Sequence, residues 1–523
     1  MIDRPEASRR LQKASAGARL LVVLAGMCLG AAAASPLAPA AARGKQFFLT
    51  GKSASGQAVE ARVGRDAIAM PAAAIPCASC HGRDGLGRAE GGVTPANLSW
   101  AHLTKPYGHR HAYGRQHPAF TEETLTRAVT TGIDPAGNRL DPTMPRYALS
   151  AGDAADLVAF LGHLGTERVP GVDAATIRVG TVVPGPGPLA ETGEVMQAVM
   201  AAYFADVNAA GGVYNRRIEL ASAVRGTTPE STLGNVKRLL EDDAAFALVG
   251  AFASGADREM ATLAEAEEVP LVAPFTLFPQ DAPASGGFSF YLHPGLKQQA
   301  VSLVDYAARS VGLANPRVAV VHPAAAVYQE VADAVEAEGR KLGWTRFSRI
   351  PLPPGSAGAA ALIAQLVREK IDAIFLFGLN EALASLIAES ERLSPAPHVF
   401  LSGQLTDRKL VSAGALPPAL RGRVFLAYPD LPAGEGQASF AEFSRFRERH
   451  GLGVAHPSAQ IAAYCAARIL VEGLKRAGRD LSREGLVAAL EGLYQFDTGL
   501  ATVTYGPSRR IGAVELRIGG AGQ

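Results

Sequence analysis

The sequence predicts a multidomain chain whose larger part is an α/β fold with parallel sheets. The chain has 523 residues, of which 48% are hydrophobic, enough to supply two or three separate cores. The sequence pattern changes at residues 165–171, after which short apolar runs alternate with helical patterns. Before that boundary, residues 77–81 read Cys-Ala-Ser-Cys-His, a motif that belongs to a smaller domain of its own.

The N-terminus has the pattern of an export signal. Basic residues precede the apolar run 20–34, which is followed by small residues and prolines up to Ala42. We therefore expect residues 1–42 to be a signal peptide that directs the chain to the periplasm, with an uncleaved membrane anchor as the alternative. Cys28 would leave with the signal and Cys465 would remain alone, so no disulfide framework is expected.

The Cys77-Ala-Ser-Cys80-His81 motif is the pattern that covalent haem attachment requires. Each cysteine can form a thioether with one haem vinyl group, and the imidazole of the next residue can reach the iron. A Cys-x-x-Cys pair alone would also fit a redox dithiol or half of a zinc site. The adjoining His81 and the export signal favour haem.

A second iron ligand candidate, Met144, lies in an extended loop between Pro142 and Pro145. Ser150 then has the position of a helix N-cap, with Asp153 at the third helical position. The helix that follows would bury an apolar face made of Leu157, Phe160, Leu161 and Leu164.

This stretch resembles a class I cytochrome c domain, which is small and all-α. The resemblance rests on Cys77, Cys80, His81 and the Met-Pro-x-Tyr-x-Leu-Ser run. We place that domain at residues 43–168 and a linker at residues 169–176. The resemblance implies one haem c, with thioethers at both cysteines and His81 and Met144 as axial ligands. Met/His ligation raises the reduction potential, and two filled axial positions favour electron transfer over oxygen chemistry. His109 or His111 could replace Met144 or bind a metal, but a solvated loop is the preferred interpretation of the histidines at 102, 109, 111 and 117.

After the linker, apolar runs that resemble strands alternate with helical segments of ten residues or more. The strand-like runs are residues 177–183, 246–250, 269–273, 317–321, 373–377 and 399–401. Such alternation predicts parallel sheets covered by helices on both faces, with ligands at the carboxyl ends of the strands.

Catalytic motifs are missing from the sequence of this larger part. The glycine-rich run 181–187 is neither a phosphate loop nor a dinucleotide fingerprint, and no nucleophile elbow, His-Glu-x-x-His or clustered acid pair follows it. We therefore expect no enzyme activity. The formal net charge of +2, from 51 basic and 49 acidic residues, gives no sign of a nucleic-acid partner.

The larger part resembles the type I periplasmic solute-binding proteins of the leucine/isoleucine/valine-binding kind. The matching segments are residues 177–193, 208–213, 249–255, 270–276 and 317–328. The resemblance implies a two-lobed α/β domain at residues 177–523 that closes on a small molecule. The first lobe would comprise about 177–296 and 430–493, and the second about 297–429 and 494–520.

By the same resemblance, four residues would contact the solute. Ser254 would donate to a ligand carboxylate, Thr276 would add a hydroxyl and Tyr328 would close over the ligand from the second lobe. Gln404 stands where amino-acid binders of this family carry an acidic residue for the α-ammonium group. Because a neutral amide supplies no counter-charge, we expect a ligand without a required α-amino group, such as a small organic acid, an alcohol-derived product or an aromatic compound.

Three functions are compatible with these two halves. The first is a periplasmic electron-transfer cytochrome fused to a solute-binding domain, with a periplasmic dehydrogenase or another cytochrome as its redox partner. The second is the receptor of a branched-chain-amino-acid-type ABC transporter, which would meet a membrane permease and carry an accessory haem domain. The third, an enzyme that oxidises its ligand at the haem, is the weakest, because Met/His ligation leaves no open iron position.

Overall fold

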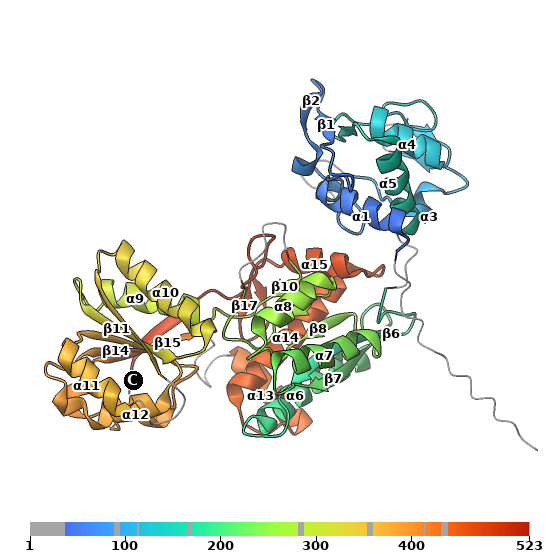
Figure 1. The fold of residues 1–523 in the computed structure, drawn as a ribbon. Helices are drawn as coiled ribbons and strands as arrows, with labels where there is room; N and C mark the ends of the chain where they lie inside the picture. The colour runs from blue at the N-terminus through green and yellow to red at the C-terminus, as the bar shows by residue number, and fades with distance from the viewer. Residues whose placement is uncertain are drawn as a thin grey trace, which may run out of the picture. The chain divides into compact units, whose positions relative to one another are not determined.

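The computed structural model describes residues 37–87, 95–111, 114–164, 169–280, 287–352, 359–412, 414–429 and 438–521 (Figure 1). Residues 1–36, which hold most of the predicted signal peptide and Cys28, lie outside these ranges. Among the helices described, none combines the length and the apolar character needed to span a bilayer.

The N-terminal domain is built from short helices around a small sheet. Its helices are α1 (Pro39–Thr50), α2 (Ala78–His81), α3 (Trp100–Leu103), α4 (Glu122–Thr131) and α5 (Ala151–His163). Its strands are β1 (Glu60–Val63), β2 (Ile68–Pro71) and β5 (Arg146–Tyr147), in the order β2-β1-β5, and a separate pair of β3 (His109–Arg110) and β4 (Gln116–His117).

Helices α1 and α5 form the main helix pair of this domain. Gly44 makes the close approach possible, because a Cβ atom there would lie 1.9 Å from the carbonyl oxygen of Asp156. Phe48 of α1 packs on Phe160 of α5, with ring centroids 5.3 Å apart. Helix α1 begins at Pro39 and buries Ala41, so it includes the last four residues of the predicted signal segment.

Helix α5 follows the sequence prediction. The Ser150 hydroxyl oxygen accepts a hydrogen bond from the Asp153 backbone N–H at 3.1 Å, which caps the first turn. The Asp153 carboxylate in turn accepts from the Ser150 hydroxyl at 2.6 Å. The predicted apolar face is confirmed, because the side chains at 157, 160, 161 and 164 are all buried.

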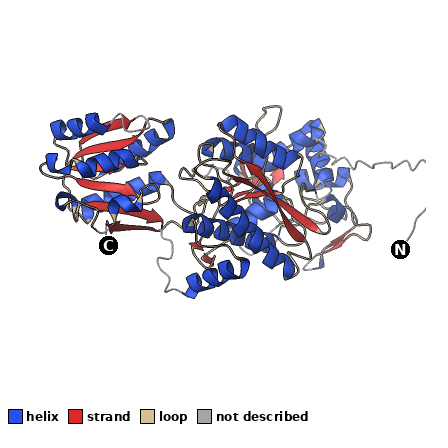
Figure 2. Cartoon of the chain, turned by 90° about the horizontal axis from the view of Figure 1, so that it is seen from below, coloured by secondary structure: helices blue, strands red, loops and turns tan. Residues whose placement is uncertain are grey.

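The first α/β lobe is a five-stranded parallel sheet in the order β10-β9-β8-β6-β7. Its strands are β6 (Thr176–Val183), β7 (Arg217–Val224), β8 (Ala247–Val249), β9 (Leu271–Val272) and β10 (Ser289–Phe290). Its helices are α6 (Ala190–Ala209), α7 (Pro229–Glu241), α8 (Asp257–Ala266), α13 (Ala438–His450), α14 (Pro457–Ala477) and α15 (Arg483–Glu491). Helices cover both faces of the sheet, as predicted (Figure 2).

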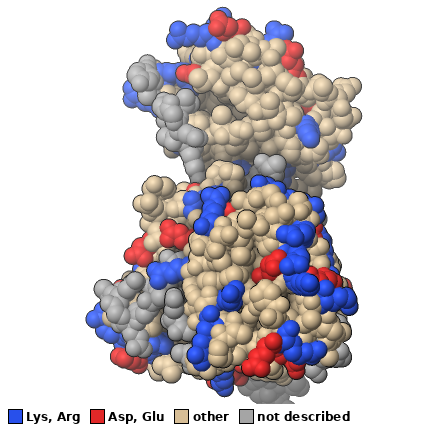
Figure 3. All heavy atoms as spheres, turned by 90° about the vertical axis from the view of Figure 1, so that its left-hand side faces the viewer, with Lys and Arg blue, Asp and Glu red and all other residues tan. Residues whose placement is uncertain are grey.

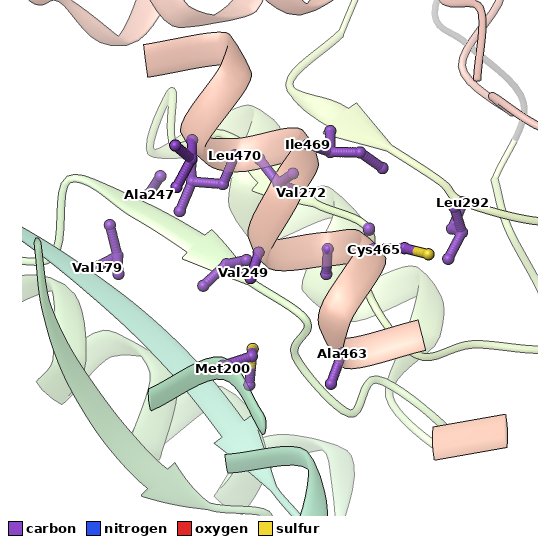
Figure 4. Close-up of a cluster of buried hydrophobic side chains, with 14 of the residues drawn as sticks. Val179, Met200, Ala247, Val249, Val272, Leu292, Ala463, Cys465, Ile469 and Leu470 are labelled. Atoms are coloured by element: carbon purple, nitrogen blue, oxygen red, sulfur yellow. The ribbon is translucent and has the colours of Figure 1, made fainter. Parts of the chain in front are cut away.

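Helix α14 comes from far along the chain to complete the core of this lobe. Figure 4 shows its residues Ala463, Cys465, Ile469 and Leu470 among side chains of the strands. Cys465 is fully buried, and its thiol lies 3.2 Å from the Thr498 hydroxyl. This cysteine therefore acts as a small apolar core residue.

The second lobe is a six-stranded sheet in the order β12-β11-β13-β14-β15-β18, parallel except for β18. Its strands are β11 (Arg317–Pro323), β12 (Arg346–Leu352), β13 (Ala373–Leu376), β14 (His398–Ser402), β15 (Val424–Pro429) and β18 (Leu516–Gly520). Its helices are α9 (Leu296–Arg309), α10 (Ala326–Lys341), α11 (Ala359–Glu369) and α12 (Asn380–Ala388). Three stacked rings on neighbouring strands, Phe375, Phe400 and Phe425, pack along one face.

The predicted boundary at residue 494 assigned the C-terminal segment to the second lobe, but most of this segment packs in the first. A small hairpin of β16 (Phe496–Asp497) and β17 (Thr502–Val503) follows α15. Leu500, Val503 and Tyr505 are buried in the core of the first lobe, and only β18 joins the second sheet. Apolar side chains in the hairpin thus hold most of this segment to the first lobe.

Charged side chains are mixed on the surface. On the face drawn in Figure 3, basic and acidic residues are scattered among uncharged ones without a broad patch of one sign. Several form local ion pairs, such as Arg349 with both Asp333 and Glu336 in the second lobe.

Candidate functional site

The Cys-x-x-Cys-His segment folds as one short helical turn. Helix α2 places the thiols of Cys77 and Cys80 three residues apart, on the same side of the turn. Both cysteines are free thiols, with Cys77 half-buried and Cys80 exposed. The backbone N–H of His81 donates to the carbonyl of Cys77 at 3.0 Å, which closes the turn.

A backbone carbonyl orients the His81 side chain. It is buried, and its Nδ1 lies 2.9 Å from the carbonyl oxygen of Ala96. An N–H at Nδ1 donates to that carbonyl and leaves the Nε2 lone pair free, as in most metal-ligating histidines. Burial lowers the pKa of His81 and so favours the neutral form that can bind a metal.

The alternative interpretations of the Cys-x-x-Cys pair fit less well. A redox dithiol reacts as a thiolate, which a lowered thiol pKa favours. Burial instead raises the pKa of Cys77 to about 12. Within the described residues, no three His, Cys, Asp or Glu side chains are grouped to hold a metal ion. Haem needs only two thiols for attachment and one or two protein ligands for its iron, so this donor set fits haem.

The loop that carries Met144 is fixed by Arg146. The Arg146 guanidinium donates to the carbonyls of Met144 and, at 3.0 Å, of Leu140. Gly132, at φ +73°, makes room for this side chain, because a Cβ there would lie 1.7 Å from Arg146 Nε. The Asp141 carboxylate accepts from the Thr143 N–H at 2.9 Å and closes the turn before Met144.

Met144 and the thiol segment pack into the same core. The half-buried Met144, Cys77 and Ala78 all lie against one cluster of buried side chains, which includes Phe47, Tyr147 and Leu157. The structure thus brings Cys77 and Met144, 67 positions apart in sequence, to a common core.

The histidines at 102, 109, 111 and 117 do not form the solvated loop that we preferred. Their rings stack on one another at centroid distances of 4.8–5.9 Å, and those of His109 and His117 contact Phe120. His117 is buried, and its Nε2 lies 2.9 Å from that of His111. Neutral imidazoles can pack in this way because burial lowers the pKa of His111 to about 4 and also lowers that of His102 and His109.

In the first lobe, the predicted solute contacts lie where strands β8 and β9 end. The Ala253 N–H donates to the Phe275 carbonyl at 3.0 Å, and the rings of Phe252 and Phe275 stack at 5.7 Å. These contacts place the loops of Ser254 and Thr276 side by side, and both residues are half-buried. This is the edge of the sheet at which α/β folds bind ligands.

Asp257, at the start of α8, organises these loops and was not identified from the sequence. One of its carboxylate oxygens accepts from the Gly255 N–H at 2.9 Å, and the other accepts from the Thr276 hydroxyl. Burial raises the pKa of Asp257. The Thr276 hydroxyl proton is therefore directed at Asp257, which orients the residue without leaving that proton for a ligand.

Tyr328 reaches the same region from the second lobe. It lies in the first turn of α10, and its ring meets that of Phe278 edge-on, with centroids 5.3 Å apart. Burial raises the pKa of Tyr328, and the charge of Asp257 raises it further. Three predicted contacts, Ser254, Thr276 and Tyr328, thus meet around residues 275–278.

Gln404 is exposed, and a chain of hydrogen bonds sets the direction of its amide. The Ser402 hydroxyl donates to Gln299 Oε1 at 2.7 Å, and Gln299 Nε2 donates to Gln404 Oε1 at 2.7 Å. Gln299 is fully buried, so this chain is held inside the lobe. The Gln404 carbonyl oxygen already accepts one hydrogen bond, and its NH2 group remains as a donor. No sequence pattern indicates the part that Gln299 plays.

Comparisons with known proteins agree with the two domains. Residues 176–518 match the family model described as periplasmic binding protein, and residues 41–165 match that described as cytochrome c. An amino acid binding protein of Pseudomonas aeruginosa is 26% identical over 46% of this chain, which spans 64% of that relative. The Leu/Ile/Val-binding protein BraC3 of Rhizobium johnstonii is 22% identical over 64% of this chain and 88% of its own.

Solved structures share the two-lobed fold. A branched chain amino acid ABC transporter structure from Thermus thermophilus, with bound valine, superposes with a TM-score of 0.53. It is 18% identical, and the match covers 66% of this chain and 93% of that one. The chain belongs to the periplasmic binding protein family, with a type I domain similar to the Leu/Ile/Val-binding proteins, and carries a cytochrome c domain at residues 41–165 ahead of it.

Proposed function

We propose that this protein is a periplasmic c-type cytochrome that transfers electrons and whose second domain binds a small organic acid. One haem would be attached to Cys77 and Cys80 and ligated by His81 and Met144. The observation that carries the proposal is the His81 Nδ1 contact with the Ala96 carbonyl, beside two free thiols on one helical turn. It leaves an imidazole nitrogen available beside both attachment points.

When bound, haem c would supply a one-electron redox centre. The protein would hold the iron from both sides through His81 and Met144, and the packing around Met144 would keep water from its position. This arrangement favours electron exchange with a periplasmic dehydrogenase or another cytochrome. Catalysis at the iron is disfavoured, because both axial positions would be filled.

The second domain would bind a ligand without an α-amino group. The named relatives bind amino acids or Leu/Ile/Val, but an ammonium group needs an acceptor or a negative charge. Gln404 offers a donor instead, because its carbonyl oxygen already accepts from Gln299. The alternative function is that of an ABC transporter receptor for amino acids, in which the haem domain is an accessory.

Two measurements on the full chain test the proposal. Visible spectroscopy during a redox titration should show one low-spin haem that cycles reversibly and does not bind carbon monoxide. Calorimetry should show binding of small organic acids and none of leucine. Rapid carbon monoxide binding would contradict Met144 ligation, and tight leucine binding would support the receptor alternative.

A further inference from the structure

Arg225 follows strand β7 and reaches across the end of the first-lobe sheet to the Ser254 loop. In the strand order β8-β6-β7, the residue lies two strands away from that loop. Its backbone N–H donates to the Val183 carbonyl at 2.8 Å, which fixes it beside the end of β6. Its Nη2 atom lies 2.5 Å from the position that a Cβ of Gly255 would occupy.

Gly255 is required for this approach. Its φ of +87° lies in the left-handed region, and a side chain there would displace the guanidinium. The charged group therefore lies directly against the residue that follows Ser254. Nothing in the sequence pattern indicates this contact, because Arg225 and Gly255 are 30 positions apart and on non-adjacent strands.

The Arg225 guanidinium has no counter-charge in the part of the chain that the structure describes. No ion pair of the described residues includes Arg225, and its Nε is buried without a hydrogen-bond partner. Asp257, the nearest acid on the Ser254 loop, already accepts from Gly255 and Thr276.

A half-buried guanidinium without a partner is costly, and a carboxylate is the anion that matches its planar donor geometry. A carboxylate that accepts from the Ser254 hydroxyl would lie beside Gly255 and hence beside Arg225. We propose that Arg225 binds the carboxylate of the solute, so that the ligand of this domain is a net anion rather than a zwitterion. This inference rests on the proposed solute-binding function.

The test measures how strongly the full chain prefers an acid over its neutral amide. Calorimetry would compare propionate, succinate and benzoate with propionamide, succinamide and benzamide, and would include leucine as a zwitterion. The variants are R225Q, R225K and the control R217Q, which removes an exposed arginine at the other end of β7. The wild type and R217Q should prefer at least one acid by about 10- to 100-fold, as expected for hydrogen bonds to a charged group.

In R225Q this preference should fall to nearly one, and in R225K it should be intermediate, because lysine keeps the charge but loses the planar fork. If R225Q does not fold, two other results test the inference. These are a weaker preference for acids in R225K and a steep salt dependence of acid binding in the wild type. An unchanged preference in both variants, or a wild type that binds amides or leucine as well as acids, would overturn the inference and leave solute binding intact. Failure of every probe to bind the wild type would contradict the solute-binding proposal and this inference with it.

Discussion

The Tyr147 hydroxyl donates a hydrogen bond to the Ile75 carbonyl oxygen at 2.6 Å. Tyr147 follows the Met144 loop, and Ile75 precedes Cys77, so this bond joins the two segments that carry the predicted iron ligands. The tyrosine is buried, and its ring packs edge-on against Phe47 of α1 at 5.7 Å. The position of Met144 relative to the thiols therefore depends on Tyr147, which is not itself a predicted iron ligand.

Tyr147→Phe should destabilise the N-terminal domain. The substitution leaves the Ile75 carbonyl without its partner, which costs about 1–2 kcal/mol of unfolding free energy at a buried site. It should also weaken the spectroscopic signature of Met ligation in the oxidised protein. Denaturant unfolding followed at the haem absorbance measures the first effect. Tyr107→Phe, at a residue that is 82% exposed, is the control and should change neither quantity.

Met144→Ala should lower the reduction potential of the haem and open one axial position. Methionine ligation stabilises reduced iron, so its loss favours the oxidised state. A redox titration measures the shift, and added imidazole should then bind to the iron. Met70→Ala, in strand β2 of the same domain, should leave the potential unchanged. If Met144→Ala had the wild-type potential, His109 or His111 would become the preferred ligand.

The stacked histidines should make the N-terminal domain sensitive to acid. Burial, with Arg115 and the neighbouring imidazoles, lowers the pKa of His111 from its ordinary 6.5 to about 4, while Asp134 acts in the opposite direction. A lowered folded-state pKa means that the stabilising contribution is present above pH 6.5 and is lost as the pH falls from about 6.5 toward 4.

Thermal unfolding from pH 7 to pH 4 should therefore show a falling midpoint, and His111→Gln should reduce the slope. The exposed Gln57→Glu variant of the same domain is a charge control that should not alter the slope in this window. A pH slope of His111→Gln equal to that of the wild type would show that the His111 ring does not cause the effect.

Gln404→Glu should shift ligand preference toward amino acids. A carboxylate at this position can still accept from Gln299 Nε2 and adds the negative charge that an α-ammonium group needs. Calorimetry with leucine and with propionate should show a gain for the first and a loss for the second. Unchanged affinities for both would place Gln404 outside the solute site.

Local chemistry explains which features could be predicted from the sequence. The Cys-x-x-Cys-His motif, the Ser150 cap and the apolar strand runs each depend on residues close together in the chain, and the structure contains the cap and the strands. The sequence indicates Asp257 only weakly, as an acid at the first position of a helix. An acid at that position is common in helices for capping alone, so it does not by itself indicate a role in the solute site.

Other features depend on how distant segments pack. Arg225 contacts Gly255 although strand β6 lies between β7 and β8, the strands that the two residues follow. Gln299 on α9 meets Gln404 because that helix packs on β14, more than 100 positions along the chain. The polar sequence around the histidines does not indicate the Phe120 ring, which His109 and His117 contact. Such contacts follow from the three-dimensional fold and have no sequence period.

The most direct test of the account is the mass of the full chain, expressed with the machinery for covalent haem attachment and measured under denaturing conditions. The account predicts one haem that stays bound to the unfolded wild-type chain. It also predicts no covalent haem in a variant that carries both Cys77→Ala and Cys80→Ala. A wild-type chain with the mass of the bare polypeptide, or one that retained zinc before denaturation, would contradict the central claim that residues 77–81 attach haem.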